Sequence, residues 1–511
     1  MPDGAIKDMN GNPFAGITVT FKTMQKVQPA AKLYNAVVAA DGSGDYTTVI
    51  DAVKAAPSAN AVPWLIFIKE GVYTGHVAID KPNIYLIGQS RDKVFISDNL
   101  LCGGTTAVDV KVGSTVYVSG DNFYAENITF DNSWGVTQNA GPQALALFTD
   151  GDKAILNNCA LRSYQDTYRT STSGITDRHY VRNCFIEGAV DFIYGAGDVF
   201  FDACTLNIVR DGGGYIVAPS HNASTAWGYV FNNCTITAPS NKIASTTIYL
   251  GRPWIDSPKT VYLNTTSLIN IYPSGWYYKM GTIPAIFADY NTMDKYGNKM
   301  DLSSRIKDYE YDIKDASGNV TSTVKGTAKN SLTDTEAATY TLKNVLSGSD
   351  DWQPALITES VAAPVIAGNS QTITWAKVNY AICYVITKNN KVVKFTTDLT
   401  FTDTAASNGD IYSVQAANEY GGLSSVSNTY TAVVTGFEKI DKSGITVLAV
   451  KGAINVSGID SDAIVSIYSI NGSLLKSEKV VGTASFPLTK GTYVVTVVSA
   501  HATNKTVVLV R

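Results

Sequence analysis

The sequence predicts an all-β protein, with a solenoid of stacked coils followed by small β-sandwich domains. Val, Ile, Thr, Tyr and Asn dominate after the first third of the chain, where helix formers are sparse. Short β runs recur with Asn directly before an inward apolar residue, as at Asn83, Asn127 and Asn158. Inward cysteines recur every 20 to 30 residues, about the length of one solenoid coil, at Cys159, Cys184, Cys204 and Cys234.

The asparagines and cysteines suit such coils for separate reasons. Asn tolerates the left-handed backbone conformation needed at corners between strands. Cysteine at an equivalent inward position of successive coils would form a buried ladder of structural thiols. The six cysteines include no C-x-x-C pair, so a zinc or thioredoxin-like site is not indicated. We expect no metal and no organic cofactor.

Changes in pattern divide the chain into four predicted units. Residues 1–33 resemble a partial Ig-like remnant or a linker. Residues 34–358 form the solenoid, which opens with an amphipathic helix stopped by Pro57 and ends after a helical segment at 332–346. Residues 359–436 alternate apolar and polar positions and resemble a fibronectin type III-like sandwich, with Trp375 in its core. Residues 437–511 contain a hairpin turn at Asn471-Gly472 and resemble the C-terminal sorting domains of type IX secretion.

Charge and hydropathy exclude some classes of function. Charged residues make up 16% of the chain and the net charge is −4, with no basic stripe, which argues against nucleic-acid binding. No apolar run reaches about 18 residues, so no membrane span is expected. The first 30 residues lack an apolar signal core, so we expect a signal that was removed or a longer precursor.

The chemistry indicated by the residues is that of carboxylates. A G-x-S-x-G elbow is absent, and the four histidines adjoin no nucleophile motif; we expect His179 and His221 to be solvated loop residues. In GAVDFIYG (188–195), Asp191 lies in an apolar run, where an unpaired charge is costly. Its expected partner is Arg252 of YLGRPW, because a guanidinium can hold a carboxylate with two hydrogen bonds. A purely structural ion pair is the alternative at this point.

Four motifs together resemble the pectin methylesterases (pectinesterases, carbohydrate esterase family 8). QALAL, YQDT, GxVDFIxG and LGRPW occur in this order over about 110 residues. The resemblance implies a right-handed parallel β-helix of the pectin lyase-like type. It also implies hydrolysis of galacturonate methyl esters in pectin with release of methanol.

The same resemblance implies a role for each matching residue. Asp191 is the expected nucleophile and Asp166 the general acid/base, while Gln143 and Gln165 would stabilise the oxyanion and Arg252 would hold Asp191. The expected substrate contacts are Trp254, Tyr168, Phe192 and Trp276.

The chain departs from the family pattern beside Asp166 and near its start. Tyr168 and Arg169 follow QDT, where leucine and tyrosine are usual, and Gly75 replaces the glutamate of a G-x-Y-x-E motif. We hypothesise that Arg169 favours a neighbouring free galacturonate carboxylate.

Two alternatives stay open. A polygalacturonase or pectate lyase on the same scaffold would use paired carboxylates or a calcium cluster, but Asp198 and Asp202, the nearest acidic neighbours of Asp191, resemble coil-surface residues. A non-catalytic pectin-binding surface protein is the second alternative. For all of these functions we expect a monomer that is secreted or displayed on a bacterial cell surface. Secretion machinery would export it through residues 437–511.

Overall fold

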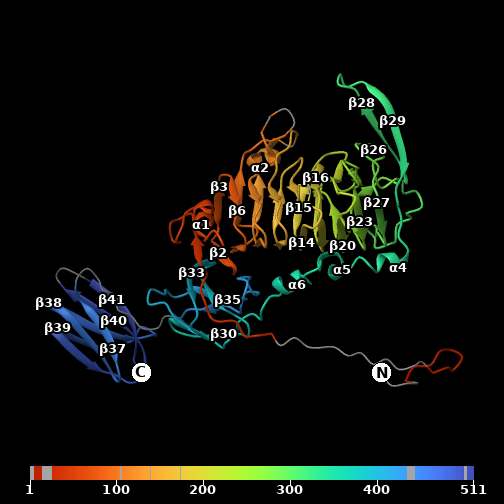
Figure 1. The fold of residues 1–511 in the computed structure, drawn as a ribbon. Coiled ribbons are helices and arrows are strands. Elements are labelled where there is room, and N and C mark those ends of the chain that lie inside the picture. Colours follow the sequence, from red (N-terminus) through yellow and green to blue (C-terminus); the bar gives the residue numbers. More distant parts are fainter. Residues whose placement is uncertain are drawn as a thin grey trace.

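The computed structural model describes residues 5–13, 26–103, 106, 108–138, 140–172, 174–433, 444–499 and 503–510. Most of the chain from Ala36 to Tyr290 coils into a parallel β-helix, which runs across Figure 1. Successive coils add strands to three parallel sheets, so each strand pairs with its counterpart one coil earlier and one coil later. The predicted all-β fold with a parallel β-helix is therefore confirmed.

The three sheets are called the docking sheet, the site sheet and the third sheet. The docking sheet comprises β1 (Ala36–Val38), β2 (Trp64–Ile68), β5 (Ile84–Gly88), β8 (Tyr124–Glu126), β11 (Ala154–Asn157), β14 (Arg178–Arg182), β17 (Asp198–Asp202), β20 (Tyr229–Asn232), β23 (Lys259–Leu263) and β27 (Ile286–Tyr290). The site sheet comprises β4 (Val77–Ile79), β7 (Val116–Val118), β10 (Leu147–Thr149), β13 (Tyr168–Arg169), β16 (Val190–Gly195), β19 (Tyr215–Pro219), β22 (Thr247–Gly251) and β25 (Asn270–Ile271). The third sheet comprises β3 (Gly71–Thr74), β6 (Val94–Asp98), β9 (Thr129–Asn132), β12 (Ala160–Arg162), β15 (Phe185–Gly188), β18 (Thr205–Ile208), β21 (Thr235–Thr237) and β24 (Thr266–Ser267).

The corners and the interior of the solenoid follow the predicted pattern. The corner residues before the inward positions have positive φ, including Asn127 (57°) and Asn183 (52°). Ala203 takes the same conformation (52°) before Cys204, although alanine has no side chain that favours it. The four ladder cysteines are free and buried in the core, as predicted, and Cys102 and Cys383 are also free and buried.

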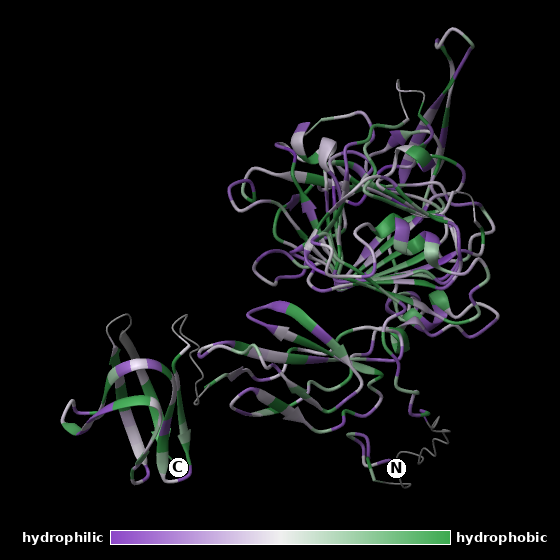
Figure 2. Ribbon diagram, turned by 90° about the vertical axis from the view of Figure 1, so that its left-hand side faces the viewer, coloured by the Kyte–Doolittle hydropathy of each residue, from purple (hydrophilic) through white to green (hydrophobic). Residues whose placement is uncertain are grey.

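Short helices cover one end and one face of the solenoid. Helix α1 (Val49–Ala55) begins at Thr48, whose hydroxyl accepts a hydrogen bond from the Asp51 N–H, and it packs Val49 and Val53 into the core. Figure 2, turned by 90° from Figure 1, shows the apolar strands of the solenoid gathered around its interior. The other helices are α2 (Val110–Gly113), α3 (Ser133–Gln138), α4 (Asp334–Ala337), α5 (Leu342–Leu346) and α6 (Pro354–Ile357). Among the described residues, no helix is long and apolar enough to cross a bilayer.

Two antiparallel sheets follow the solenoid and pack against each other. Their shared core contains Trp375, which is buried against Tyr384 as predicted. The first consists of β30 (Ile366–Asn369), β31 (Thr372–Trp375) and β34 (Thr400–Thr402); the second of β33 (Lys391–Thr396), β32 (Cys383–Lys388), β35 (Ile411–Ala417) and β36 (Tyr430–Thr431).

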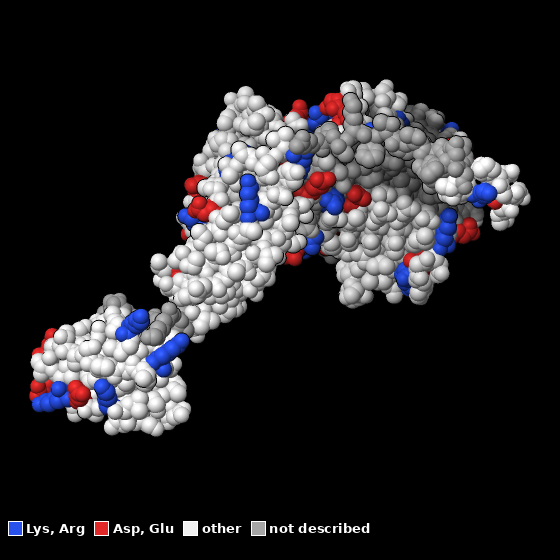
Figure 3. Space-filling model, turned by 90° about the horizontal axis from the view of Figure 1, so that it is seen from below, with Lys and Arg blue, Asp and Glu red and all other residues white. Residues whose placement is uncertain are grey.

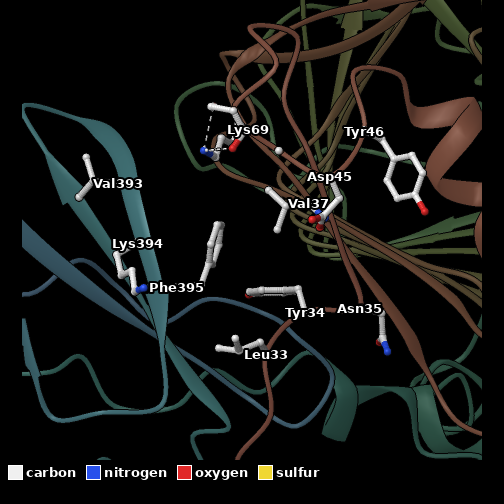
Figure 4. A pocket seen from close by; sticks show the side chains of 12 residues that line it. Leu33, Tyr34, Asn35, Val37, Asp45, Tyr46, Lys69, Val393, Lys394 and Phe395 are labelled. Atoms are coloured by element: carbon white, nitrogen blue, oxygen red, sulfur yellow. Dashed lines mark hydrogen bonds between the residues drawn. The ribbon is translucent and has the colours of Figure 1, made fainter.

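This sandwich is attached to the docking sheet. Phe395 of β33 packs edge-on against Phe67 and Tyr34, and a pocket at this junction is lined from both sides (Figure 4). The buried Glu126 carboxylate accepts a hydrogen bond from the Leu423 N–H at 3.1 Å. Apolar contacts and buried polar bonds thus join the two units.

The remaining strands form one small sheet and one long-stranded sheet. Strands β26 (Lys279–Met280), β28 (Asp308–Lys314) and β29 (Val320–Thr327) project from the end of the solenoid (Figure 1). The C-terminal sheet contains β37 (Thr446–Val450), β38 (Ala453–Ser469), β39 (Leu474–Pro487), β40 (Gly491–Ser499) and β41 (Thr503–Val510). Strands β38 and β39 form the hairpin predicted around Asn471-Gly472. Charged side chains of both signs are scattered on the face seen in Figure 3.

Parts of two predicted units lie outside the described residues. The Ig-like remnant (1–33) includes residues 1–4 and 14–25, and the C-terminal unit (437–511) includes 437–443, 500–502 and 511.

Candidate active site

Asp166 and Asp191 lie side by side on neighbouring coils of the site sheet. Gln165 forms an isolated backbone β-bridge with Val190, and Tyr168 pairs with Ile193 in the sheet. This register sets Asp166 opposite Asp191. The Asp166 N–H donates to the Val190 carbonyl at 3.1 Å. Adjacent strands are about 4.8 Å apart, so the two carboxyl groups share one small region of the surface.

Both aspartates have an unusual backbone conformation. Asp166 has φ +61° and Asp191 has φ +49°, the left-handed region that non-glycine residues seldom occupy. In β16 the register against β19 also shifts between Val190 and Ile193, a β-bulge at Asp191. Bulges re-aim side chains and are frequent beside active sites.

Arg252 holds Asp191 through two hydrogen bonds. Its Nε donates to Asp191 Oδ1 at 2.8 Å and its Nη2 to Oδ2 at 2.5 Å, which confirms the predicted pairing. The guanidinium also lies over the Tyr215 ring, 4.3 Å from the centroid. Such a bidentate pair favours the ionised form of Asp191.

The two carboxyl groups differ in how their charge is compensated. Burial raises the pKa of Asp191, but the hydrogen bonds and charge of Arg252 oppose that rise. Burial and then the negative charge of Asp191 raise the pKa of Asp166 well above its ordinary value, with weaker opposition from Arg252 and Arg169. These surroundings favour a proton on Asp166 and the negative charge on Asp191.

Gln143 and Gln165 lie on adjoining coils next to this pair. The Ala144 N–H donates to the Gln165 carbonyl at 3.2 Å, which places QALAL beside YQDT. Both glutamine side chains are half-buried. Neither amide forms a hydrogen bond with a described residue, so both N–H₂ groups are free to donate to an acceptor.

An apolar cluster adjoins the aspartates on the same sheet. Tyr194 and Phe148 are buried in it, and the half-buried Trp254 packs edge-on against Tyr194 with ring centroids 5.6 Å apart. Trp254 therefore lies next to the site, as predicted. Tyr194 and Phe148 were not predicted as site residues. Their positions as aromatic residues within the motifs VDFIYG and QALALF could have indicated them.

Three predicted substrate contacts are wrong, because their side chains are in the solenoid core. Tyr168, Phe192 and Trp276 each have 0% exposed surface, and Trp276 stacks on Phe287 inside the coil. Alternation along a strand predicts that Tyr168 shares the face of Asp166. The left-handed residue at Asp166 breaks that alternation, so Tyr168 points inward and Arg169 takes the outer position.

The expected surroundings of two histidines and one aspartate are also wrong. His179 and His221 are fully buried, not solvated, and burial lowers the pKa of His221 to about 3. His179 Nε2 lies 3.0 Å from the Gly151 carbonyl. Asp198 is buried rather than on the coil surface, and it accepts hydrogen bonds from the Trp227 and Gly228 N–H groups. All three side chains have structural partners.

The fold and the site together define the class of protein: a parallel β-helix with two adjacent carboxyl groups on one sheet, of which Asp191 is held by Arg252 and Asp166 has a raised pKa. The family model for Pectinesterase matches residues 35–330, and the chain belongs to this family. The match covers the site sheet and all five residues Gln143, Gln165, Asp166, Asp191 and Arg252.

Several known proteins are similar to this chain over a stretch about as long as the solenoid. Pectinesterase/pectinesterase inhibitor PPE8B of Prunus persica is 35% identical over 306 residues, which is 57% of this chain and 56% of the relative. Putative pectinesterase/pectinesterase inhibitor 26 of Arabidopsis thaliana is 33% identical over 334 residues, 63% of this chain and 31% of the relative. The chain thus spans about a third to just over half of these relatives. The solved pectin methylesterase from carrot is 28% identical with a TM-score of 0.50, covering 65% of this chain and 97% of the carrot chain.

Proposed function

We propose that this protein hydrolyses the methyl esters of galacturonate residues in pectin and releases methanol. The observation that carries the proposal is a pair of adjacent carboxyl groups in which Arg252 holds Asp191 with two hydrogen bonds, while burial and the charge of Asp191 raise the pKa of Asp166. Membership of the pectinesterase family supports the same activity. Ester hydrolysis through a covalent intermediate needs one nucleophile and one proton donor, and the site contains both.

The first half of the reaction forms an acyl-enzyme. An Asp191 carboxylate oxygen attacks the ester carbonyl carbon, and the carbonyl oxygen becomes an oxyanion. The amides of Gln143 and Gln165 donate to that oxyanion. When the tetrahedral intermediate collapses, the bond to the methoxy group breaks and Asp166 gives its proton to the departing methanol.

The second half restores the enzyme. Asp166, now a carboxylate, removes a proton from water as the water oxygen attacks the acyl carbon of the anhydride. The bond to Asp191 breaks, and the product is a free galacturonate carboxylic acid with Asp191 again ionised and Asp166 again protonated. Arg252 stabilises Asp191 as nucleophile and as leaving group. No step needs a group outside the chain other than water.

The flanking units support a role outside the cell. We propose that residues 359–436 are a fibronectin type III-like spacer and that residues 437–511 are a sorting domain recognised by secretion machinery. The sandwich core around Trp375 leaves that aromatic buried, which favours a spacer over a sugar-binding module. The proposed location is secreted or on the cell surface of a bacterium.

Methanol release distinguishes the proposal from its rivals. The full chain is incubated with methyl-esterified oligogalacturonate, and methanol and oligomer length are both measured, with Asp191→Asn as the comparison. The proposal predicts methanol without chain shortening for the wild type and neither for the variant. Shortened chains without methanol would indicate a polygalacturonase or lyase. Retention of the oligomer with no product would indicate a binding protein.

A further inference from the structure

Gly141 lies directly against the side-chain amide of Gln165, one of the two proposed oxyanion donors. A Cβ added at Gly141 would come closer to Gln165 Oε1 than non-bonded atoms can approach, and it would lie 3.6 Å from Gln165 Cδ. Gln165 Nε2 would lie more than 4 Å from the same Cβ. The carbonyl end of the amide therefore rests against Gly141, and the N–H₂ end points away from it.

The contact with Gln165 is the reason that position 141 needs a glycine. The φ of Gly141 is outside the left-handed region, so the backbone at this position admits a residue with a side chain. Apart from its chain neighbours, the added Cβ would meet no other atom of the described residues within 4 Å. Gly141 is also exposed to solvent. A substitution at position 141 therefore acts on one amide group.

Other crowded glycines of the solenoid face backbone instead. A Cβ at Gly120 would collide with the Lys81 carbonyl group, and a Cβ at Gly214 would collide with that of Ala189. Neighbouring coils must shift to relieve such a collision, whereas the end of a glutamine side chain rotates at low cost. A methyl group at position 141 should therefore move the amide and leave the fold intact.

Gly103 has a similar relation to Gln143, the other proposed donor. A Cβ at Gly103 would lie 3.2 Å from both Cδ and Oε1 of Gln143. Gly103 has φ +62°, however, so its backbone conformation favours glycine independently of the amide. Position 141 is the one of these two at which the effect of the amide contact can be measured alone.

We propose that Gly141 is a positioning residue that keeps the Gln165 amide in place to donate to the oxyanion. This inference rests on the proposed esterase activity and adds a residue that acts through Gln165. An oxyanion donor is effective because it is already aimed at the charge that develops in the transition state. Displacement of the amide should therefore lower kcat and leave the binding of pectin nearly unchanged.

Gly141→Ala in the full chain tests the proposal with methyl-esterified oligogalacturonate as substrate. We expect kcat for methanol release to fall about 10²-fold with little change in KM, the effect of misplacing one catalytic donor by about 1 Å. The urea unfolding midpoint should stay at the wild-type value. Gln165→Ala should also lower kcat, and adding Gly141→Ala to it should lower kcat no further, because no amide remains to be displaced.

Gly120→Ala is the matched control. It adds the same methyl group at another glycine outside the left-handed region, but against the Lys81 backbone. This variant should lower the urea unfolding midpoint, and its folded fraction should retain wild-type kcat.

Three results would refute the role of Gly141 while the esterase function stands. They are wild-type kcat in Gly141→Ala, an equal loss of kcat with and without the Gln165 amide, and a large loss of stability in Gly141→Ala. If the wild type releases no methanol, the proposed function itself fails.

Discussion

Two arginine–aspartate pairs in this solenoid have the same hydrogen-bond geometry and different surroundings. In Asp191–Arg252 and in Asp289–Arg305, Nε donates to one carboxylate oxygen at 2.8 Å and Nη2 donates to the other. The side chains of Asp289 and Arg305 are 0% and 1% exposed, against 9% and 23% for Asp191 and Arg252. The geometry of the pair alone therefore does not identify a functional site.

The remaining partners of each pair make the difference. Asp289 also accepts from the Thr292 hydroxyl, and Arg305 Nη1 donates to the Tyr272 and Pro273 carbonyls. Asp191 has no described donor besides Arg252 and interacts with the second carboxyl group, that of Asp166; the side-chain amides of Gln143 and Gln165 on the adjoining coils are unbonded. A fully satisfied pair is a structural element, whereas a pair beside unused donors and a protonated acid can perform chemistry.

The largest expected effect separates the two aspartates by activity. Asp191→Asn should lower the rate of methanol release by at least about 10⁴-fold, as for loss of a covalent nucleophile. Its urea unfolding midpoint should stay close to that of the wild type, because water can reach the partly exposed Arg252. A variant that keeps one tenth of the activity would contradict the assignment of the nucleophile.

The buried pair should show the reverse. Asp289→Asn leaves the Arg305 guanidinium buried without its counter-charge, which costs about 3–5 kcal/mol in the free energy of unfolding. Urea unfolding followed by circular dichroism measures this loss. The folded fraction should retain wild-type kcat, and a normal unfolding midpoint would show that the pair is not structural.

A smaller effect tests the unbonded amides. Gln143→Ala removes one proposed oxyanion donor and should reduce kcat about 10²–10³-fold with little change in KM, because the hydrogen bond forms chiefly in the transition state. A purely ground-state role would instead raise KM at constant kcat.

The protonated aspartate makes stability depend on pH in a defined direction. Because the pKa of Asp166 is raised above its ordinary 3.8 in the folded protein, its contribution to stability is present below that value and is lost as pH rises through the folded pKa. Asp166→Asn mimics the protonated form. The unfolding midpoint of the variant minus that of the wild type should therefore be larger at pH 8 than at pH 4. Equal differences at both values would mean that Asp166 is ionised in the folded state.

The same two pKa directions predict a bell-shaped rate profile. Activity should fall on the acid side as Asp191 takes up a proton and on the basic side as Asp166 loses one. Steady-state kcat/KM for methanol release across this range measures both limbs.

The smallest effect tests the division between core and surface. Tyr168→Phe removes the contact of 3.0 Å between the Tyr168 hydroxyl and Thr149 Oγ1, which should cost about 1 kcal/mol of stability and leave KM unchanged. Tyr194→Ala, on the outer face, should raise KM several-fold. A higher KM in Tyr168→Phe would show that the inward orientation is wrong.

Sequence reasoning predicted the solenoid and the principal acidic residues for physical reasons. The Asn corners and the cysteine ladder repeat once per coil, so they report the stacking directly. An aspartate in the apolar run VDFIYG needs a compensating charge, and the guanidinium of LGRPW supplies it. Burial of His179 and Asp198 could not be predicted, because their partners come from neighbouring coils.

The sequence by itself therefore determined the parallel β-helix, its membership of the pectinesterase family and the acidic pair with its arginine. Only the tertiary structure decided which neighbours of the aspartates face outward. The left-handed conformations at Asp166 and Asp191 break the alternation of the strands, which turns Tyr168 and Ile193 into the core and brings Arg169 and Tyr194 to the outer face. Such a break depends on pairing with adjacent coils, which a local sequence pattern does not specify.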